Sequence, residues 1–117
     1  MAVTFTGSSA TTLTTLLFNS QSGATYTLAL SDADNTQVET TNSSAVTITV
    51  PPDGDVAFPT GSQINIAQIG TGQITIVGGS GVTVSATPGL KLRAQYSTAV
   101  LIKRSSNAWL LAGDLTA

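Results

Sequence analysis

Apolar and polar residues alternate in short stretches along most of the chain, from residue 26 to residue 111. In the central part each polar residue lies between two aliphatic residues, as in Ile64-Asn65-Ile66, Ile74-Thr75-Ile76, Val82-Thr83-Val84 and Leu90-Lys91-Leu92. The same rule holds for an earlier stretch, Val46-Thr47-Ile48-Thr49-Val50. Because successive side chains in a strand point to opposite faces, this pattern predicts strands with one buried face.

Turn-forming residues separate the predicted strands about every eight to ten residues. Glycine reaches positive φ at little cost and proline presets a turn, and these residues form the separators Gly70-Thr71-Gly72, Gly78-Gly79-Ser80-Gly81 and Thr87-Pro88-Gly89. The apolar pairs start ten, eight and eight residues apart, at Ile64, Ile74, Val82 and Leu90. Such intervals are shorter than one coil of a β-helix and favour successive hairpins.

The predicted fold is all-β: a compact antiparallel domain of the β-sandwich, jelly-roll-like or barrel type, spanning residues 23–117. The continuous apolar run at residues 99–102 predicts a strand that is buried on both faces. Tyr96 and Trp109 lie within apolar alternation, so we expect both in the core. Ser31 to Asn35 is expected to form a turn, because Asp and Asn side chains bond to their own backbone.

Residues 1–22 are expected to form a short N-terminal arm or an edge segment. Alternation with Thr in the first six residues suggests a strand, whereas the later leucines have the spacing of a helix face. One interpretation is an extended arm that becomes ordered on a partner, and the other is an ordinary edge strand of the domain. The candidate residues for capsid docking or for exchange between subunits are Val3, Phe5, Leu13, Leu16, Leu17 and Phe18.

The composition indicates that the surface of the protein is poor in charge. Charged residues make up 9% of the chain, against about 25% in ordinary soluble domains. Twenty Thr and thirteen Ser provide hydroxyl groups for hydration instead. With six aromatic residues the core must be mostly aliphatic, so we expect a marginally stable monomer that gains stability by assembling with copies of itself.

The few charges are unevenly distributed and limit the classes of partner. Five of the six acids precede Phe58, whereas all four bases lie between residues 91 and 104. In one interpretation, the acidic edge of one subunit contacts the basic edge of a neighbouring subunit. In the other, the acids and the bases each form a solvated strand face. Four bases without interleaved aromatics are too few for a nucleic-acid groove. No signal peptide or membrane span is apparent, and cytoplasmic synthesis is expected.

The residue inventory excludes several kinds of catalysis. The sequence contains no His and no Cys, so imidazole bases, thiolates, disulfides and the usual zinc sites are excluded. The acids lie in turn-like contexts, where Asp serves backbone hydrogen bonding. We therefore predict no catalytic residue, no cofactor and no metal site, and we expect a protein that is not an enzyme.

Five motifs follow one another between residues 56 and 115. They are Phe58-Pro59-Thr60-Gly61, Gln68-Ile69-Gly70-Thr71-Gly72-Gln73, Gly79-Ser80-Gly81-Val82-Thr83, LKLRAQY at residues 90–96 and WLLAGDL at residues 109–115. As a set they resemble a module that recurs in structural proteins of tailed bacteriophages. The resemblance extends upstream to residues 26–28 and 46–52.

This resemblance implies a component of the virion, made in the host cytoplasm. A small subunit that starts at Met1 is more similar to a capsid decoration (head accessory) protein than to a long fibre. We expect it to be a homotrimer on the outer capsid surface, where it binds the major capsid protein and stabilises the shell. The alternative is a module of the tail tip or fibre that binds a host surface saccharide through Tyr96 or Trp109.

Overall fold

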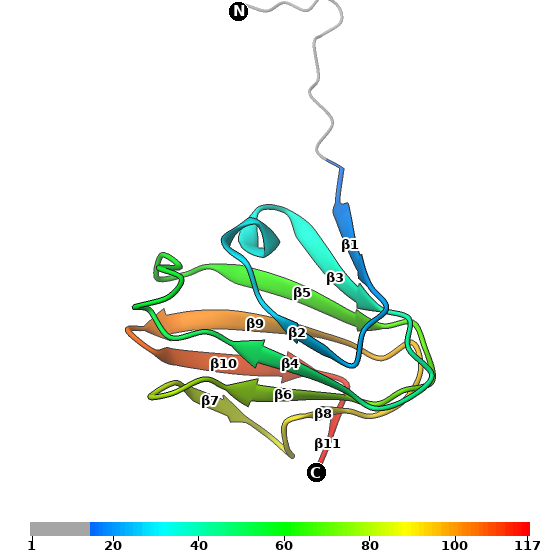
Figure 1. Cartoon of the computed structure of the whole chain (residues 1–117). Helices are drawn as coiled ribbons and strands as arrows, with labels where there is room; N and C mark the ends of the chain where they lie inside the picture. The colour runs from blue at the N-terminus through cyan, green and yellow to red at the C-terminus, as the bar shows by residue number, and fades with distance from the viewer. Residues whose placement is uncertain (1–14) are drawn as a thin grey trace, which may run out of the picture.

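The computed structural model describes residues 15–117, and nearly all of the regular secondary structure in this part of the chain is β-strand (Figure 1). One short 3-10 helix, η1, spans Leu30–Ala33, and within residues 15–117 no helix is long and apolar enough to cross a membrane. The all-β prediction is confirmed. The strands are β1 Leu17–Gln21, β2 Thr25–Thr27, β3 Thr36–Thr40, β4 Val46–Val50, β5 Gln63–Gln68, β6 Ile74–Gly78, β7 Thr83–Ala86, β8 Lys91–Leu92, β9 Thr98–Ser105, β10 Ala108–Gly113 and β11 Leu115–Thr116.

The strands form two sheets that share one core. Sheet A has the order β1-β3-β5-β9-β10-β7, and sheet B has the order β11-β8-β6-β4-β2. From β1 to β6 the chain alternates between the sheets, so that strands adjacent in a sheet are two apart in sequence (Figure 1). The pairs β1–β3, β3–β5, β2–β4 and β4–β6 are all parallel. The first half of the chain therefore winds in a solenoid-like manner.

The prediction of successive antiparallel hairpins is wrong for this half. Gln37 pairs with Asn65 and Val46 pairs with Ile74, so one coil of the chain is 28 residues long here. The eight-to-ten-residue interval in the sequence separates strands that lie in opposite sheets, and it is not the length of a coil. Antiparallel pairs occur later, in β5–β9, β9–β10, β6–β8 and β8–β11, so both sheets are mixed.

The alternating aliphatic residues form the core, as predicted. Buried side chains from both sheets belong to one cluster, which includes Val38, Val46, Ile48, Val50, Ile64, Ile66, Ile74, Ile76, Leu92 and Leu101. Trp109 is also buried, and its ring meets Phe58 edge-on with 5.3 Å between ring centroids. This contact packs two large aromatic side chains against each other within the otherwise aliphatic core.

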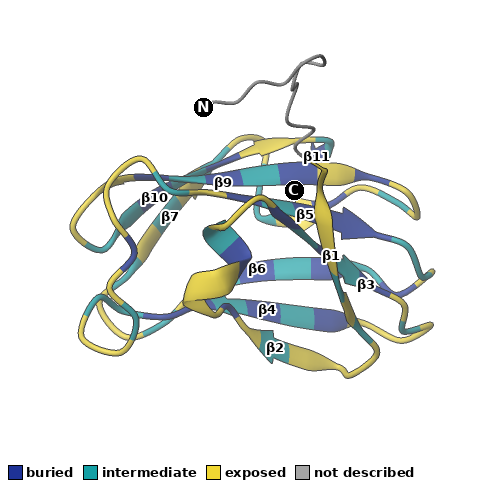
Figure 2. Ribbon diagram, turned by 90° about the horizontal axis from the view of Figure 1, so that it is seen from above, coloured by how far each residue is buried: buried dark blue, intermediate teal, exposed yellow. Residues whose placement is uncertain are grey.

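Two predictions about burial are wrong. Val100 and Ile102 in β9 are only partly buried, because the outer face of sheet A is not covered by any described part of the chain. Tyr96 is 69% exposed, since the chain leaves β8 after Leu92 and turns outward before β9. The positive φ of Tyr96, 70°, belongs to this turn. Figure 2 shows that β4 and β6 alternate between buried and intermediate residues, whereas β1 and most of the loops are mainly exposed.

The glycines of the Gly70-Thr71-Gly72 separator are required for close approach, and not for the positive φ that we predicted. Neither has positive φ, and both lie against the backbone of the loop that follows β3. A Cβ at Gly72 would be 2.8 Å from the Asn42 carbonyl oxygen and closer still to the backbone of Ser44. Glycine here lets the loops of two successive coils stack.

We expect Gly72→Ala to lower the free energy of unfolding by about 1–3 kcal/mol, because the added methyl group forces two loop backbones apart. Chemical denaturation measures the change. Gly54→Ala is the matched control, since a Cβ at Gly54 meets nothing within 4 Å. Equal stability of the two variants would contradict the stacking of these loops.

Lys103 shows that the basic residues are not all on a solvated face. Its side chain is 4% exposed and its Nζ donates hydrogen bonds to Asp53 Oδ1 at 2.7 Å and to the Phe58 carbonyl oxygen at 2.6 Å. The hydrogen bond from Lys103, aided by one from Ser106, lowers the pKa of Asp53. This acid and this base, 50 residues apart in sequence, fasten the loop after β4 to β9.

We expect Lys103→Met to cost about 1–3 kcal/mol, because the Phe58 carbonyl oxygen loses a buried hydrogen-bond donor. Thermal unfolding at neutral pH, compared with that of the exposed Lys91→Met, measures the effect. A lowered carboxyl pKa stabilises the fold above the unfolded pKa of about 4 and ceases to do so as pH falls through the folded value. Part of the difference between wild type and Lys103→Met should therefore disappear on acidification. If Lys103→Met and Lys91→Met unfolded at the same temperature, the stabilising role of the buried Lys103 would be contradicted.

Candidate functional site

The exposed apolar residues at the start of the described chain are the first candidate for a binding surface. Leu16 is 37% exposed, Leu17 58% and Phe18 64%. The last two belong to β1, which lies at the edge of sheet A and, within residues 15–117, pairs only with β3 (Figure 1). The structure therefore places residues 17–21 in an edge strand and not in a helix. Three other candidates, Val3, Phe5 and Leu13, lie outside the described residues.

A polar network holds β1 on the body of the protein. Asn19 Nδ2 donates to Tyr26 Oη at 2.8 Å and to Asp32 Oδ1 at 2.9 Å, and Tyr26 Oη donates to Asp32 Oδ2 at 2.7 Å. Gln21 Nε2 adds a hydrogen bond to Asn19 Oδ1 at 2.8 Å. Asp32 is 1% exposed, so the network joins β1, β2 and η1 in the interior. The predicted turn at residues 31–35 overlaps η1, and through Asp32 it caps the end of the core next to β1.

Burial, together with the hydrogen bond to the Asp32 carboxylate, raises the pKa of Tyr26 to about 12. The phenol proton is therefore a fixed part of the network at physiological pH. Since the network places polar groups on the inner side of β1, it ends the aliphatic core at this side of the molecule. These hydrogen bonds hold the edge strand in place, and no other part of residues 15–117 pairs with its outer edge.

The outer face of sheet A continues from the edge strand as a row of side chains. In register across the strands lie Phe18, Gln37, Asn65, Val100 and Ala112. Gln37 Nε2 donates to Glu39 Oε2 at 2.8 Å, which orients the Gln37 amide. Part of this row lines a shallow depression of about 260 Å³. Small apolar groups and amides dominate the face, which suits contact with another protein surface.

The second candidate surface surrounds Tyr96. The loop that carries it is braced, because Tyr96 N donates to the Gln68 carbonyl oxygen at 2.6 Å and Gln95 Nε2 donates to the Ile69 carbonyl oxygen at 3.0 Å. The ring is therefore presented to solvent on a fixed backbone. Trp109, the other predicted aromatic platform, is 2% exposed and cannot contact a ligand.

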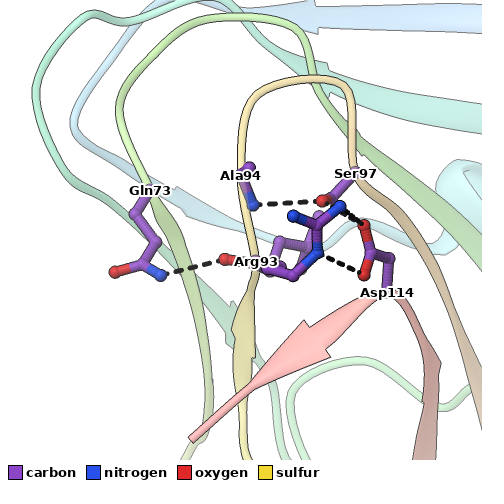
Figure 3. A network of polar contacts seen from close by, with 6 residues as sticks. Gln73, Arg93, Ala94, Ser97 and Asp114 are labelled. Atoms are coloured by element: carbon purple, nitrogen blue, oxygen red, sulfur yellow. Dashed lines mark hydrogen bonds and ion pairs between the residues drawn. The ribbon is translucent and has the colours of Figure 1, made fainter.

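An ion pair next to this loop adds a charged element (Figure 3). Arg93 Nε and Nη2 donate to the two carboxylate oxygens of Asp114 at 2.8 and 2.9 Å, and Ser97 Oγ donates to Asp114 Oδ2 at 2.7 Å. These contacts lower the pKa of Asp114 and raise that of Arg93. Both side chains are well exposed, so the pair fixes the geometry of the loop more than it stabilises the fold.

Neither surface brings together a set of catalytic groups. Among residues 15–117, no group of three or more acids is close enough to hold a metal ion. The two surfaces can bind a partner by burying apolar side chains, by hydrogen bonding through amides and, at Tyr96, by stacking on an aromatic ring. Exposure of Tyr96 had no clear signal in the sequence, because apolar alternation continues through its neighbours.

No protein-family model, curated protein or solved structure shows significant similarity to the chain. The resemblance to phage structural proteins therefore rests on the sequence motifs alone.

The polar network predicts a specific dependence of stability on alkaline pH. The unfolded state loses its phenol proton above the ordinary pKa of 10.0, whereas folded Tyr26 keeps its proton up to about pH 12. Stability from this group is therefore complete below pH 10 and is lost as pH rises through 12. Denaturant unfolding between about pH 8 and pH 12 should show this fall in the wild type.

Tyr26→Phe should be less stable at neutral pH, because it loses the hydrogen bond to Asp32, and should lack the Tyr26 part of the alkaline fall. Tyr96→Phe is the matched control and should keep that fall, since its hydroxyl is on an exposed side chain. A Tyr26→Phe variant with the same alkaline slope as the wild type would disprove the role of this phenol.

Proposed function

We propose that the protein is a non-enzymatic structural component of tailed-bacteriophage particles, a capsid decoration protein that binds the outer capsid surface and stabilises it. Its partners are the major capsid protein and two further copies of itself, in a homotrimer. The observation that carries the proposal is the uncharged apolar edge at Leu16, Leu17 and Phe18, which is fixed on a rigid body. The phage-like motifs of residues 56–115 provide the biological context.

Mass action provides the mechanism of stabilisation. A protein that binds the assembled shell, and not the separate capsid subunits, shifts the equilibrium towards the shell. Burial of the exposed leucines and phenylalanine contributes about 25 cal/mol for each Å² of apolar surface removed from water. Many weak copies on one particle then add up to a large effect. In this proposal, the body of the subunit is a two-layer sandwich, with sheets A and B facing one another across the aliphatic core.

A second candidate is a tail-tip or fibre module that binds a host surface saccharide. The exposed ring of Tyr96 on its braced loop favours it, because aromatic faces stack on sugar rings and the neighbouring Gln95 and Arg93 carry hydrogen-bond donors. Trp109 has no part in this version of the proposal, since it is buried.

Cryo-electron microscopy of particles that carry the protein tests the proposal, with copies counted relative to the major capsid protein. Many copies at capsid symmetry positions are expected. A few copies confined to the tail would contradict the decoration role and favour saccharide binding.

Paired variants separate the two surfaces on the same particles. Leu17→Ser with Phe18→Ser should reduce capsid occupancy and heat resistance of the shell, because it removes the exposed apolar groups. Tyr96→Ser is the matched control at an equally exposed aromatic, and should leave occupancy unchanged. Loss of adsorption to host cells with Tyr96→Ser alone, together with binding on a glycan array, would reverse the assignment.

A further inference from the structure

The outer edge of β1, which no other strand of residues 15–117 pairs with, has none of the features that usually protect an edge strand. Sheets A and B end in four strands, β1, β7, β2 and β11, of five, four, three and two residues. The longest of these is β1, and its sequence LFNSQ contains no charge and no proline. Its register with β3 is continuous and has no bulge. Natural proteins protect such edges with short strands, charges, prolines or bulges, because an open edge pairs with other strands.

The hydrogen bonds to β3 show which main-chain groups of β1 point away from the described part of sheet A. Leu17 N donates to the Asn35 carbonyl oxygen, and Thr41 N donates to the Gln21 carbonyl oxygen, so Leu17 and Gln21 are directed at β3. In a parallel pair, alternate residues face the partner. Phe18 and Ser20 therefore direct their N–H and C=O groups away from β3. Asn19 points inward to Asp32, so the side chains of Phe18 and Ser20 lie on the outer face.

The strand is also held in place before any partner arrives. Its inner side is tied to Tyr26 and Asp32, and the Asn35 side chain donates to the Thr15 carbonyl oxygen at the entry to the strand. A fixed edge loses little conformational entropy when another strand is added. Main-chain hydrogen bonds then supply affinity, and alternate side chains supply specificity.

We propose that this edge accepts residues 3–6 of a second copy of the chain as an additional strand of sheet A. Val3-Thr4-Phe5-Thr6 is the segment outside the described residues that has strand alternation. Added to β1, it places Val3 and Phe5 on the outer face beside Phe18. The inference rests on the homotrimer of the proposed function, because a ring closes when each copy passes its segment to the next.

Connection lengths argue against a continuation of the winding by the same chain. Between β1 and β3 the chain uses residues 22–35, fourteen residues, to cross through sheet B and return. Residues 7–16, which join the segment to β1, number ten. Fully extended, ten residues span about 33–36 Å, which is enough to reach a neighbouring subunit. A hairpin within one chain is the competing arrangement, and the experiment distinguishes it.

Native mass spectrometry of the wild type and of edge variants tests the strand addition. Ser20→Pro removes the outward N–H and leaves the hydrogen bonds to β3 in place. We expect a trimer for the wild type and a rise of about tenfold or more in its dissociation constant for Ser20→Pro. Phe18→Lys is the second edge variant, with the same expectation, and Tyr96→Lys is the exposed control that stays trimeric. A monomeric wild type, or edge variants that stay trimeric with unchanged circular dichroism, would overturn the inference.

Cross-linking identifies the occupant, and the absence of native cysteine makes it specific. The double variant Phe5→Cys with Ser20→Cys, treated with a short bis-maleimide, should give covalent dimers and trimers. Phe5→Cys with Thr116→Cys, at the edge of sheet B, is the control that should not cross-link. A cross-link within single chains, or no cross-link at all, rejects exchange between copies.

The two proposals fail separately. A Ser20→Pro protein that stays trimeric overturns the strand addition and leaves capsid binding untouched. A wild type that occupies no capsids, but dissociates on Ser20→Pro, overturns the decoration role and keeps the strand addition.

Discussion

Parallel stacking of aliphatic side chains between successive coils is the interaction on which this structure depends. Ile48 lies beside Ile76 in sheet B, and Val38 lies beside Ile66 in sheet A, all fully buried. Each column is continuous only if the coils stay in register, since a slip of one residue would turn every side chain to the other face. The small aliphatic core leaves little reserve against such a slip. The corners of the coils must therefore be fixed as firmly as the strands.

Three local devices fix those corners. Gly70 and Gly72 allow two loops to stack at one corner. Buried Lys103 holds the loop after β4 through Asp53 and the Phe58 carbonyl oxygen. At the N-terminal end the carboxylate of Asp32 ends the apolar interior with hydrogen bonds, where a further coil would otherwise be needed. The protein has few charged residues, and three of them, Asp32, Asp53 and Lys103, form these contacts.

The same arrangement explains where binding surfaces are found. Because the cap is polar inside, the first strand keeps Phe18 on its outer face, and Leu17 at the start of the strand is also largely exposed. The loop of Tyr96 is exposed for a related reason, since the chain must leave sheet B after β8 and return to sheet A as β9. Both surfaces are consequences of how the chain passes between sheets. The proposed decoration of a capsid and the alternative binding of a saccharide thus rest on two different surfaces of the same domain, the edge of β1 and the loop of Tyr96.

The sequence by itself determined that the domain is built of strands and which aliphatic residues form most of its core. Alternation is a local property of strands, so Val46, Ile48 and Val50 could be assigned to the core without knowledge of their partners. The absence of His and Cys is equally independent of the fold. The exposed position of Leu17 and Phe18 agrees with the choice of these residues as candidates, although their role in docking remains a prediction.

Only the tertiary structure decided which strands pair and in which direction. A period of two is the same in parallel and antiparallel sheets, and the path of the chain between two sheets is set by contacts between residues far apart in sequence. For the same reason the burial of Lys103 could not be predicted, because its partner Asp53 lies 50 residues away. Tyr96 was wrongly predicted to be buried, because the apolar alternation in the sequence continues beyond Leu92, where β8 ends. Only pairing between strands far apart in sequence determines where a strand ends.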